Sequence, residues 1–279
     1  MSQPLFSIII ANYNHGEFLG EAIRSVVRQT CQDFELIIVD GGSTDNSVHV
    51  IRNFQDRIAW WCSERDNGQS DAFNKGFAKA KGTYGCWLNA DDIMMPDALW
   101  HIREYIMKYP HTQWIAGSTV FFDPLMNVLW CSRCIRTSPA LFRRFSAICV
   151  NGPSSFFSLN IFRDVDGFDE SLHYVMDIDL WRRFLKKGIR LAHVKKYLWG
   201  FRVHSQSKTS HVFLAGNANP KFQQERLAMK KKHRYSDLMM KWDIYCTKLI
   251  RLISLTYFWS YLDTKRYKGK PVSRLAEQK

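Results

Sequence analysis

The sequence predicts an α/β fold, with helices flanking a mixed, mostly parallel sheet and a helical C-terminal extension. Short β-branched runs alternate with helical patterns over the first hundred residues, which is typical of a parallel sheet. Polar clusters follow the predicted strands, where sheets of this class bind ligands. Hydrophobic residues make up 46% of the 279 residues, which is enough for a core and too much for a disordered chain.

The individual elements follow from the period of the apolar residues. Strands are expected at residues 6–11, which form a short β-branched run, and at residues 35–39, 58–62, 84–88, 190–193 and 197–203. Helices are expected where apolar residues recur at helical spacing, at residues 17–29, from 46, 71–80, 94–105 and 177–186. Thr44 or Asp45 is available to cap the second helix. Residues 114–157 are less regular and are predicted to be mixed sheet and loops.

Net charge and cysteine content indicate which partners and which cellular compartment to expect. The net charge is +13, which favours anionic partners such as nucleic acid, phosphorylated small molecules or an anionic membrane, and the excess lies in residues 221–279. A solvated basic tail without a partner is the alternative. Seven cysteines and no secretory pattern at the start predict a reducing, cytosolic setting. Cys131 and Cys134 lack a second pair or a matching His, so we expect core or strand residues rather than zinc ligands.

Two adjacent carboxylates, Asp91 and Asp92, follow the strand predicted at residues 84–88. Such carboxylates repel each other unless a cation lies beside them. Mg²⁺ and Mn²⁺ prefer oxygen ligands and commonly link carboxylates to substrate phosphates. The pair therefore predicts a metal site, and the alternative is a turn in which Asp92 or Asp97 caps the next helix.

Further candidates lie at the same edge of the predicted sheet. Asp40 ends the second strand, where it suits a nucleobase imide or a ribose hydroxyl, although an Asp-Gly turn explains it equally well. Asp71, with Lys75 close behind, is either a ligand contact or a helix N-cap. Asn12, in the loop after the first strand, completes the predicted ligand-binding set.

The second half of the chain offers a base and an imidazole. Asp177 and Asp179 are two residues apart on a predicted helix, so their side chains point roughly 200° apart and cannot face one pocket equally. One is a candidate base, and the other is a cap or a partner of Arg182 or Arg183. His204 follows the last predicted strand and is a candidate metal ligand or diphosphate contact.

Together these pieces resemble glycosyltransferase family 2, which has the GT-A fold. The resemblance covers residues 5–210, in the pieces 7–14 (SIIIANYN), 34–47 (FELIIVDGGSTDNS), 63–76 (SERDNGQSDAFNKG), 87–96 (WLNADDIMMP), 167–181 (GFDESLHYVMDIDLW) and 201–209 (FRVHSQSKT). It implies an inverting enzyme that moves a sugar from a UDP-, GDP- or dTDP-sugar to an acceptor hydroxyl. The acceptor is expected to be a lipid-linked or polysaccharide intermediate of O-antigen, capsule or exopolysaccharide synthesis. Residues 1–115 are then the nucleotide-sugar-binding half of a 1–215 catalytic domain, and residues 116–215 are the acceptor-binding half.

The resemblance also implies roles for the metal-site candidates. Asp92 matches the ligand of Mg²⁺ or Mn²⁺ in the DxD-type motif, and Asp91 matches its donor-contacting neighbour. That motif often begins with Asp where this chain has Asn89, which leaves the role of Asn89 open. His204 matches a position near the diphosphate and is included with Asp92 in the expected metal site.

The same similarity makes Asp177 the expected catalytic base, with Asp179 as the nearest alternative. Asp40 is the expected nucleobase contact and Asp71 a second donor contact. One carboxylate base without a second carboxylate nucleophile implies inversion at the anomeric carbon.

Residues 216–279 are expected to form a basic amphipathic helical extension. Apolar residues recur there at helical spacing, at Trp242, Cys246, Leu249, Ile253, Tyr257 and Tyr261. The uncharged stretch at 252–262 is shorter than the ~20 residues that a bilayer span needs. Its aromatic residues and flanking cations favour an interfacial helix on an anionic membrane, at the cytoplasmic face. A helix packed on the catalytic domain is the alternative.

Two other functions fit the sequence less well. A sugar-nucleotide nucleotidyltransferase is expected to carry a Gly-rich loop with Arg or Lys after the first strand, and residues 12–16 contain no such cation. A non-catalytic basic binding protein would leave the acidic clusters at the strand ends unexplained. No nucleic-acid partner is therefore expected.

Overall fold

The computed structural model describes residues 3–135, 139, 150, 152–207, 219–233, 245–246 and 248–275. The strands are β1 (Phe6–Asn12), β2 (Phe34–Asp40), β3 (Trp60–Ser63), β4 (Tyr84–Asn89), β5 (Ile93–Met94), β6 (Trp114–Phe122), β7 (Val128–Ser132), β8 (Ser155–Ser158) and β9 (Leu191–Arg202). The helices are α1 (Gly16–Val27), α2 (Ser47–Arg52), α3 (Gln69–Lys79), α4 (Ala98–Lys108), α6 (Leu159–Arg163), α7 (Met176–Lys186), α9 (Pro220–His233) and α11 (Thr256–Tyr267). Short 3₁₀ turns lie at η1 (Gln55–Arg57), η2 (Gly152–Ser154) and η3 (Val272–Leu275).

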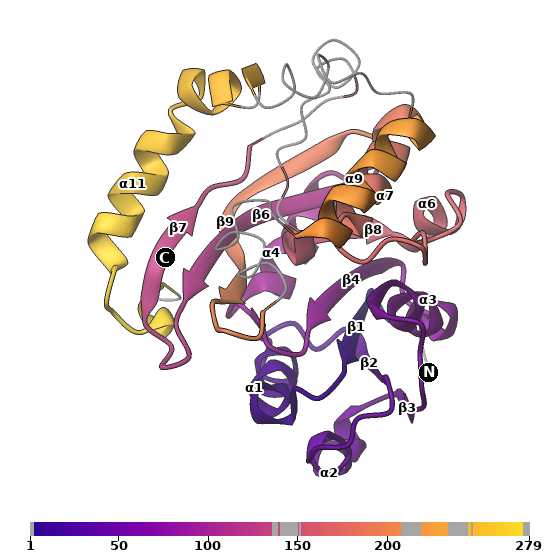
Figure 1. The fold of residues 1–279 in the computed structure, drawn as a ribbon. Coiled ribbons are helices and arrows are strands. Elements are labelled where there is room, and N and C mark those ends of the chain that lie inside the picture. Colours follow the sequence, from indigo (N-terminus) through magenta and orange to yellow (C-terminus); the bar gives the residue numbers. More distant parts are fainter. Residues whose placement is uncertain are drawn as a thin grey trace.

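One mixed sheet runs through the molecule in the order β3-β2-β1-β4-β8-β6-β9-β5, with β7 paired to β6 (Figure 1). The first four strands of this order are parallel, as the alternation of strands and helices predicts. The short β8 runs antiparallel to both of its neighbours, β4 and β6. Consequently β6 and β9 point in the same direction as β1, and the carboxyl ends of all three strands lie at the same end of the sheet.

Helices cover both faces of the sheet because the buried strands are apolar on both sides. In β1, Ile8 and Ile10 pack into one core with α1, α2 and α4, whereas Ile9 packs into the other core with α3, α6 and α7. This period of two is the normal geometry of a strand. Stacked aromatic rings fill the second core, where Trp181 lies between Trp87 and Trp114 at centroid distances of 5.4 and 4.9 Å.

The helix starts depart from the predicted caps. Asn46, rather than Thr44 or Asp45, occupies the N-cap position of α2. Asp45 instead accepts a hydrogen bond from the Ser47 amide at 2.9 Å and one from the Gly16 amide at 2.8 Å. One carboxylate therefore serves the N-termini of both α1 and α2, and these contacts lower its pKa although burial opposes them.

Two elements differ from the expected ones, whereas the two cysteines lie as expected. The two strands predicted at 190–193 and 197–203 form one continuous strand, β9, whose pairing with β6 shifts register near Ser118. The helix predicted at 94–105 is preceded by β5, and Asp97 at its N-cap makes no capping bond. Cys131 lies in β7, both Cys131 and Cys134 are buried without a disulfide, and burial raises the pKa of the Cys131 thiol to about 12.

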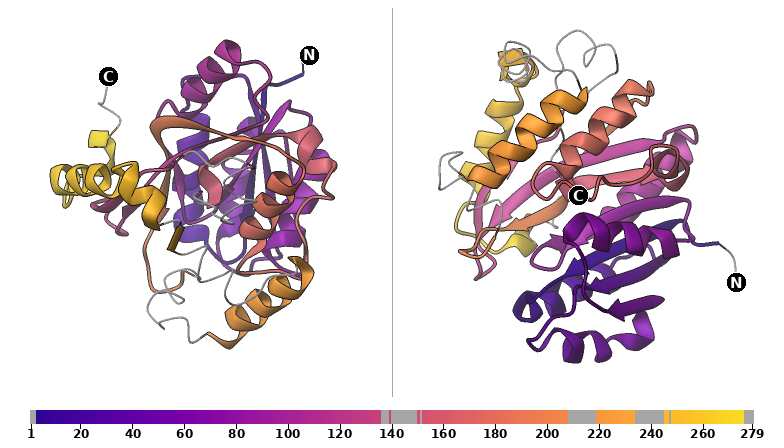
Figure 2. Two further views of the ribbon diagram at one scale, coloured as in Figure 1. Left: turned by 90° about the horizontal axis from the view of Figure 1, so that it is seen from above. Right: turned by 45° about the vertical axis from the view of Figure 1, so that its right-hand side comes forward.

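The C-terminal extension packs against the domain in two places. In Figure 2, α9 lies beside the helices that cover one face of the sheet, and α11 runs along the outer edge next to β7. Trp242 and Lys241, which belong to the predicted amphipathic pattern, lie outside the described residues. Within the residues that are described, no helix has the length and apolar character needed to cross a membrane.

Candidate active site

A pocket of about 250 Å³ opens at the carboxyl ends of β1 and β4. Its walls come from the loop after β1, the start of α3, the turn after β4 and the chain after β9. The lining residues are Ala11, Asn12, Tyr13, His15, Asp66, Gly68, Gln69, Ala72, Asn89, Ala90, Asp91, Phe201, Gln206 and Ser207. Two predicted residues, Asn12 and Asp91, therefore face the same cavity. The motif at 201–209 ends in Lys208 and Thr209, which lie outside the described residues.

Asp91 and His204 form a pair beside this pocket. His204 Nε2 lies 2.9 Å from Asp91 Oδ2, and the two side chains are 6% and 14% exposed. The imidazole is held by ring contacts with Phe18 at 4.8 Å and His15 at 5.9 Å between centroids. A carboxylate oxygen and an imidazole nitrogen are thus brought together by strands that are far apart in the sequence.

Asp92 lies beneath the turn and does not line the pocket. Its Oδ1 accepts from the Arg202 backbone amide at 3.0 Å, and its Oδ2 accepts from Asn89 Nδ2 at 2.8 Å. Burial and the neighbouring Asp91 charge raise its pKa well above the usual range, although these two hydrogen bonds oppose the rise. Asn89 also accepts from Gln69 at 2.8 Å, so its amide links α3 to the buried carboxyl.

Asp40 also lies below the pocket floor. Its two carboxylate oxygens accept bonds from Asn12 Nδ2 at 2.6 Å, the Ser43 hydroxyl and amide, and the Ser63 hydroxyl at 2.6 Å. These bonds fix Asn12 so that its Nδ2 points inward. Asn12 Oδ1 is buried and has no hydrogen-bond partner among the described residues. An unpaired buried acceptor on a pocket wall is costly unless a ligand donates to it.

Asp71 and Lys75 lie on α3 beside the pocket rather than in its wall. Asp71 is in the first turn of α3, where its Oδ2 accepts from the Asn67 amide at 2.8 Å, and Gly68 is the N-cap. Lys75 Nζ lies 3.3 Å from Glu64 and 3.6 Å from Asp71. Asp71 is therefore not the N-cap, which was the alternative to a ligand contact. Its carboxylate nevertheless accepts a hydrogen bond from the segment just before the helix.

Asp177 is not among the residues that line this pocket. A Cβ on Gly152 would lie 3.5 Å from Asp177 Oδ2 and 3.8 Å from the Trp199 ring. Asp177 begins α7 and accepts a bond from the Ile178 amide. Burial raises its pKa to about 6, although the backbone hydrogen bonds oppose the rise. A carboxyl with this pKa is suited to accept a proton near neutral pH.

Asp179 has a different environment on the same helix. It is fully buried, and its oxygens contact Arg183 at 2.7 Å, His233 at 2.7 Å and Lys232 at 3.0 Å. Burial alone would raise its pKa, but the hydrogen bond from His233 and the charges of Arg183 and Lys232 lower it. Asp179 therefore ties α9 to α7, and its carboxylate is occupied by cations.

The sequence did not single out Arg202, which is buried behind the Asp91 turn. Its Nε donates to the Asp91 carbonyl at 2.8 Å, and its Nη2 contacts Glu21 of α1. The guanidinium lies 4.8 Å from the centre of Phe18 and 4.7 Å from that of Phe122. The only signal in the sequence was its place two residues before His204, because its contacts come from distant elements.

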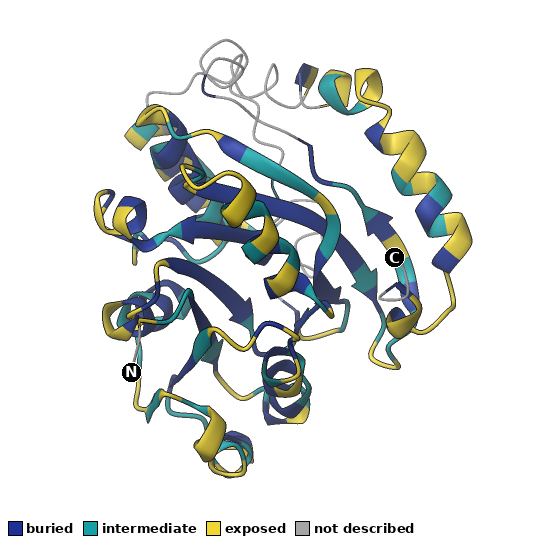
Figure 3. Ribbon diagram, turned by 180° about the vertical axis from the view of Figure 1, so that it is seen from behind, coloured by how far each residue is buried: buried dark blue, intermediate teal, exposed yellow. Residues whose placement is uncertain are grey.

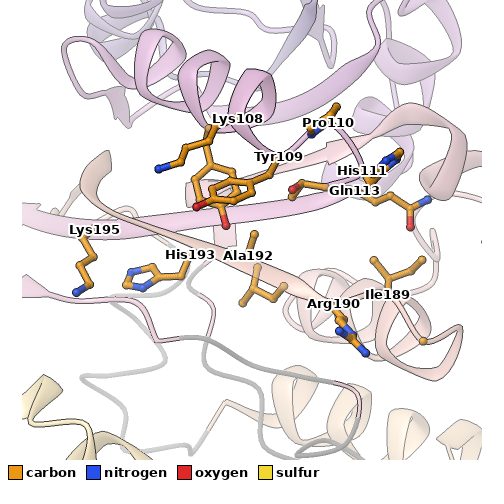
Figure 4. A pocket seen from close by; sticks show the side chains of 14 residues that line it. Lys108, Tyr109, Pro110, His111, Gln113, Ile189, Arg190, Ala192, His193 and Lys195 are labelled. Carbon is orange, nitrogen blue, oxygen red and sulfur yellow. The ribbon is translucent and has the colours of Figure 1, made fainter.

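A wider pocket of about 990 Å³ lies at the opposite ends of the strands, between the end of α4 and the start of β9 (Figure 4). Lys108, Arg190, Lys195 and two histidines line it, and no carboxylate is among the described lining residues. None of the predicted site residues lies there. The smaller pocket is therefore the candidate active site.

Known proteins resemble this chain in sequence and in fold. The family model described as Glycosyl transferase family 2 matches residues 7–165. An uncharacterized glycosyltransferase of Rickettsia typhi is 30% identical over 219 residues, which are 74% of this chain and 66% of that protein. This chain therefore spans slightly less than two thirds of that relative.

Two solved structures have the same fold at low sequence identity. S. aureus TarS 1-349 in complex with UDP-GlcNAc has a TM-score of 0.60 at 16% identity, over 74% of this chain and 60% of that one. The mannosyltransferase PcManGT from Pyrobaculum calidifontis, in complex with GDP-Man and Mn²⁺, has a TM-score of 0.62 at 15% identity. That alignment covers 99% of this chain and 79% of the other.

Proposed function

Because the chain belongs to glycosyl transferase family 2, we propose that it transfers a sugar from a UDP-, GDP- or dTDP-sugar to an acceptor hydroxyl, with inversion at the anomeric carbon. The observation that supports this most directly is the pocket lined by Asp91, which is paired with His204, and by Asn12, whose buried Oδ1 has no hydrogen-bond partner among the described residues. Family membership favours this reaction over a nucleotidyltransferase or a non-catalytic binding protein.

The donor set suits Mg²⁺ or Mn²⁺ at Asp91 and His204. The Asp91 carboxylate oxygen is a ligand that both ions prefer, and an imidazole nitrogen suits a transition metal such as Mn²⁺ better than Mg²⁺. The separation of 2.9 Å between Asp91 Oδ2 and His204 Nε2 permits a shared ion. The described residues contain no cluster of three or more acidic, His or Cys side chains, so diphosphate and water would supply the other ligands. When bound, the ion neutralises charge on the departing diphosphate. Asp92, expected as a ligand, is proposed instead to hold the turn from below.

Asp177 is proposed as the base of the transfer. Its carboxylate removes the proton of the acceptor hydroxyl as that oxygen forms a bond to the anomeric carbon. The bond from the anomeric carbon to the phosphate oxygen breaks on the opposite side, and the nucleoside diphosphate leaves with the electron pair. Asp179 is not available for this role because Arg183, Lys232 and His233 surround it.

Donor binding is proposed to use the pocket wall. Asn12 Oδ1 accepts from a nucleobase or ribose donor, and Asp40 fixes the Asn12 amide rather than contacting the base itself. Asp71 and Lys75 support the start of α3 beside the pocket. This refines the proposed division into a donor-binding half at 1–115 and an acceptor-binding half at 116–215, because Phe201, Gln206 and Ser207 also line the donor pocket.

The acceptor is proposed to be a lipid-linked or polysaccharide intermediate of cell-surface glycan synthesis. Such an acceptor would be met at the cytoplasmic face of the membrane, and the basic extension at 216–279 is the proposed membrane-facing region.

Release of nucleoside diphosphate from a panel of UDP-, GDP- and dTDP-sugars tests the proposal. The protein is incubated with Mn²⁺ or Mg²⁺ and a membrane lipid extract, and the anomeric configuration of the product is read by NMR. Metal-dependent release is expected in the wild type and in the exposed control Asp56→Asn, and it is lost in Asp91→Asn and Asp177→Asn. Full activity of Asp177→Asn would reject the assigned base, and retention at the anomeric carbon would reject inversion.

A further inference from the structure

The helix α11 has its polar face turned toward the protein and its apolar face turned toward solvent. Thr256 and Asp263 are buried, whereas Tyr257, Phe258 and Tyr261 are exposed. Figure 3 shows exposed residues along the outer side of this helix. A helix at a protein surface normally has the reverse arrangement, with the apolar stripe against the core. The inversion calls for a partner for each face.

The partner of the polar face is the free edge of β7. The Cys131 amide donates to Thr264 Oγ1 at 2.9 Å, and the Arg133 amide donates to Ser260 Oγ at 3.0 Å. Two residues along a strand span ~6.7 Å and four residues along a helix span ~6 Å, so the two hydroxyls match the two outward amides. The hydroxyls of α11 thus satisfy amides that an edge strand would leave unpaired.

Asp263 locks the helix in this orientation. Its carboxylate accepts from Arg133 Nε at 2.7 Å and Nη2 at 3.0 Å, and it also contacts the Tyr197 hydroxyl. This bidentate pair fixes the rotation of α11 about its own axis. The apolar face is therefore held outward and is not free to turn inward and pack on the sheet.

The outward face continues into the preceding helical turn. Large apolar side chains are exposed without interruption by a charge from residue 252 to residue 262, at Leu252, Ile253, Leu255, Tyr257, Phe258, Trp259 and Tyr261. We call these seven residues the α11 apolar face. Cations flank it on both sides, at Lys248, Arg251, Lys265, Arg266, Lys268 and Lys270. The single acidic residue between 245 and 275 is Asp263, which is already paired with Arg133.

We propose that the α11 apolar face inserts into the interface of an anionic lipid bilayer and orients the catalytic domain on it. Trp and Tyr favour the interface between headgroups and acyl chains, and the flanking cations match anionic headgroups. The inference deepens the proposed function, on which it rests only for the use of a lipid-linked acceptor. It also limits the proposed membrane contact to the α11 apolar face, because α9 is bound to the catalytic domain through Asp179 and Glu225.

Flotation with vesicles tests the surface without donor, metal or turnover. The wild type is incubated with vesicles of phosphatidylcholine alone and of phosphatidylcholine mixed with phosphatidylglycerol. Two double variants are compared: Ile253→Glu with Tyr261→Glu on the α11 apolar face, and Met107→Glu with Leu227→Glu on α4 and α9. The four side chains are 74%, 62%, 64% and 54% exposed, so matched changes are made at matched exposure. Thermal unfolding checks that each variant is folded.

The wild type and the α4/α9 variant are expected to float with the anionic vesicles, and the bound fraction of the α11 variant is expected to fall about tenfold or more. Equal flotation of both variants, or no flotation of the wild type, would overturn the proposal. Sedimentation without vesicles separates the case of a second copy: a wild-type dimer that the α11 variant loses, with no vesicle binding, would also overturn it. Because no activity is measured, these outcomes are independent of the transferase proposal.

Discussion

At the scale of single residues, the site depends on which neighbour of each acidic pair is buried with partners. Asp91 and Asp92 are adjacent, yet the Arg202 amide and Asn89 take up Asp92 and leave Asp91 at the pocket. Asp177 and Asp179 lie on one helix, yet Arg183, Lys232 and His233 surround Asp179 alone. In both pairs the carboxyl proposed for chemistry has fewer polar partners than its neighbour: Asp91 contacts His204, and Asp177 accepts from the Ile178 amide.

Asp177→Asn is expected to stabilise the protein while it removes activity. Burial raises the pKa of Asp177 from 3.8 to about 6 in the folded protein, so ionisation is harder there than in the unfolded chain. Stability is therefore lost as pH rises from about 4 to about 6, and above this range the variant should be more stable by about 1–3 kcal/mol. Denaturant unfolding at pH 4, 5 and 7.5 measures the difference, which should vanish at the lowest pH.

The pH dependence of the wild-type rate is a second test of the raised pKa of Asp177. Because the base must be ionised, kcat/KM is expected to rise with pH up to about 6 and then level off. Gly152→Ala places a methyl group 3.5 Å from Asp177 Oδ2, and the added desolvation should move this profile to higher pH. A profile with no inflection between pH 5 and 7, unchanged by Gly152→Ala, would contradict the assignment.

Asn89→Asp is expected to make stability depend on pH in the absence of divalent metal. Asn89 Nδ2 donates to Asp92 at 2.8 Å, and a carboxylate in its place would repel the buried Asp92 carboxyl. A proton shared by the two acids would give the folded state a raised pKa, so the variant should lose about 1–3 kcal/mol at pH 8 and recover as pH falls.

Asn89→Ala is the control, because it also removes the hydrogen bond to Asp92 but adds no charge. Thermal unfolding of both variants between pH 5 and 8 measures the comparison. Parallel pH dependence in Asn89→Asp and Asn89→Ala would show that the amide is not required as a donor to Asp92.

At the scale of elements, α9 and α11 are both attached through polar contacts in which one buried carboxylate takes part, Asp179 for α9 and Asp263 for α11. Asp179 receives His233 and Lys232 of α9, and His233 also contacts Lys186 through its other ring nitrogen. Lys is a donor only, so His233 accepts at Nδ1 and donates from Nε2 to Asp179, which makes it the neutral tautomer. The extension is thus held by buried polar contacts that the composition of residues 221–279 does not reveal.

Asp179→Asn is expected to destabilise the protein by about 3–5 kcal/mol at pH 7, because buried cations lose their countercharge. The pKa of Asp179 is lowered in the folded state, so this contribution is present above the unfolded value of about 3.9 and is lost as pH falls below it. Urea unfolding at pH 7 and at about pH 2.5 measures it. Lys232→Gln, at a 40% exposed side chain, should cost no more than about 1 kcal/mol. If Asp179→Asn were more stable than the wild type, the costly buried charge would belong to Asp179 rather than to Asp177.

At the scale of the whole molecule, the sequence predicted what depends on local period and missed what depends on distant partners. The order of β1 to β4 and the intervening helices followed from β-branched runs and helical spacing. The orientation of Asp92 did not, because it is set by Arg202, 110 residues away in the chain. Likewise, the apolar pattern at 252–262 was visible, but its outward direction depends on pairing of α11 with β7.

The two pockets lie at opposite ends of the strands, and ligand-induced stabilisation shows which of them binds the nucleotide. If donor and metal bind at Asp91, a nucleoside diphosphate with Mn²⁺ at 100 times its Kd should stabilise the protein by about 2.7 kcal/mol and raise Tm by about 5 °C. Asp91→Asn should lose the part of the shift that requires Mn²⁺, because the carboxylate paired with His204 is removed. Arg190→Gln, in the wider pocket at the opposite ends of the strands, should keep the full shift. Loss of the shift in Arg190→Gln but not in Asp91→Asn would move the nucleotide site to the amino ends of β6 and β9.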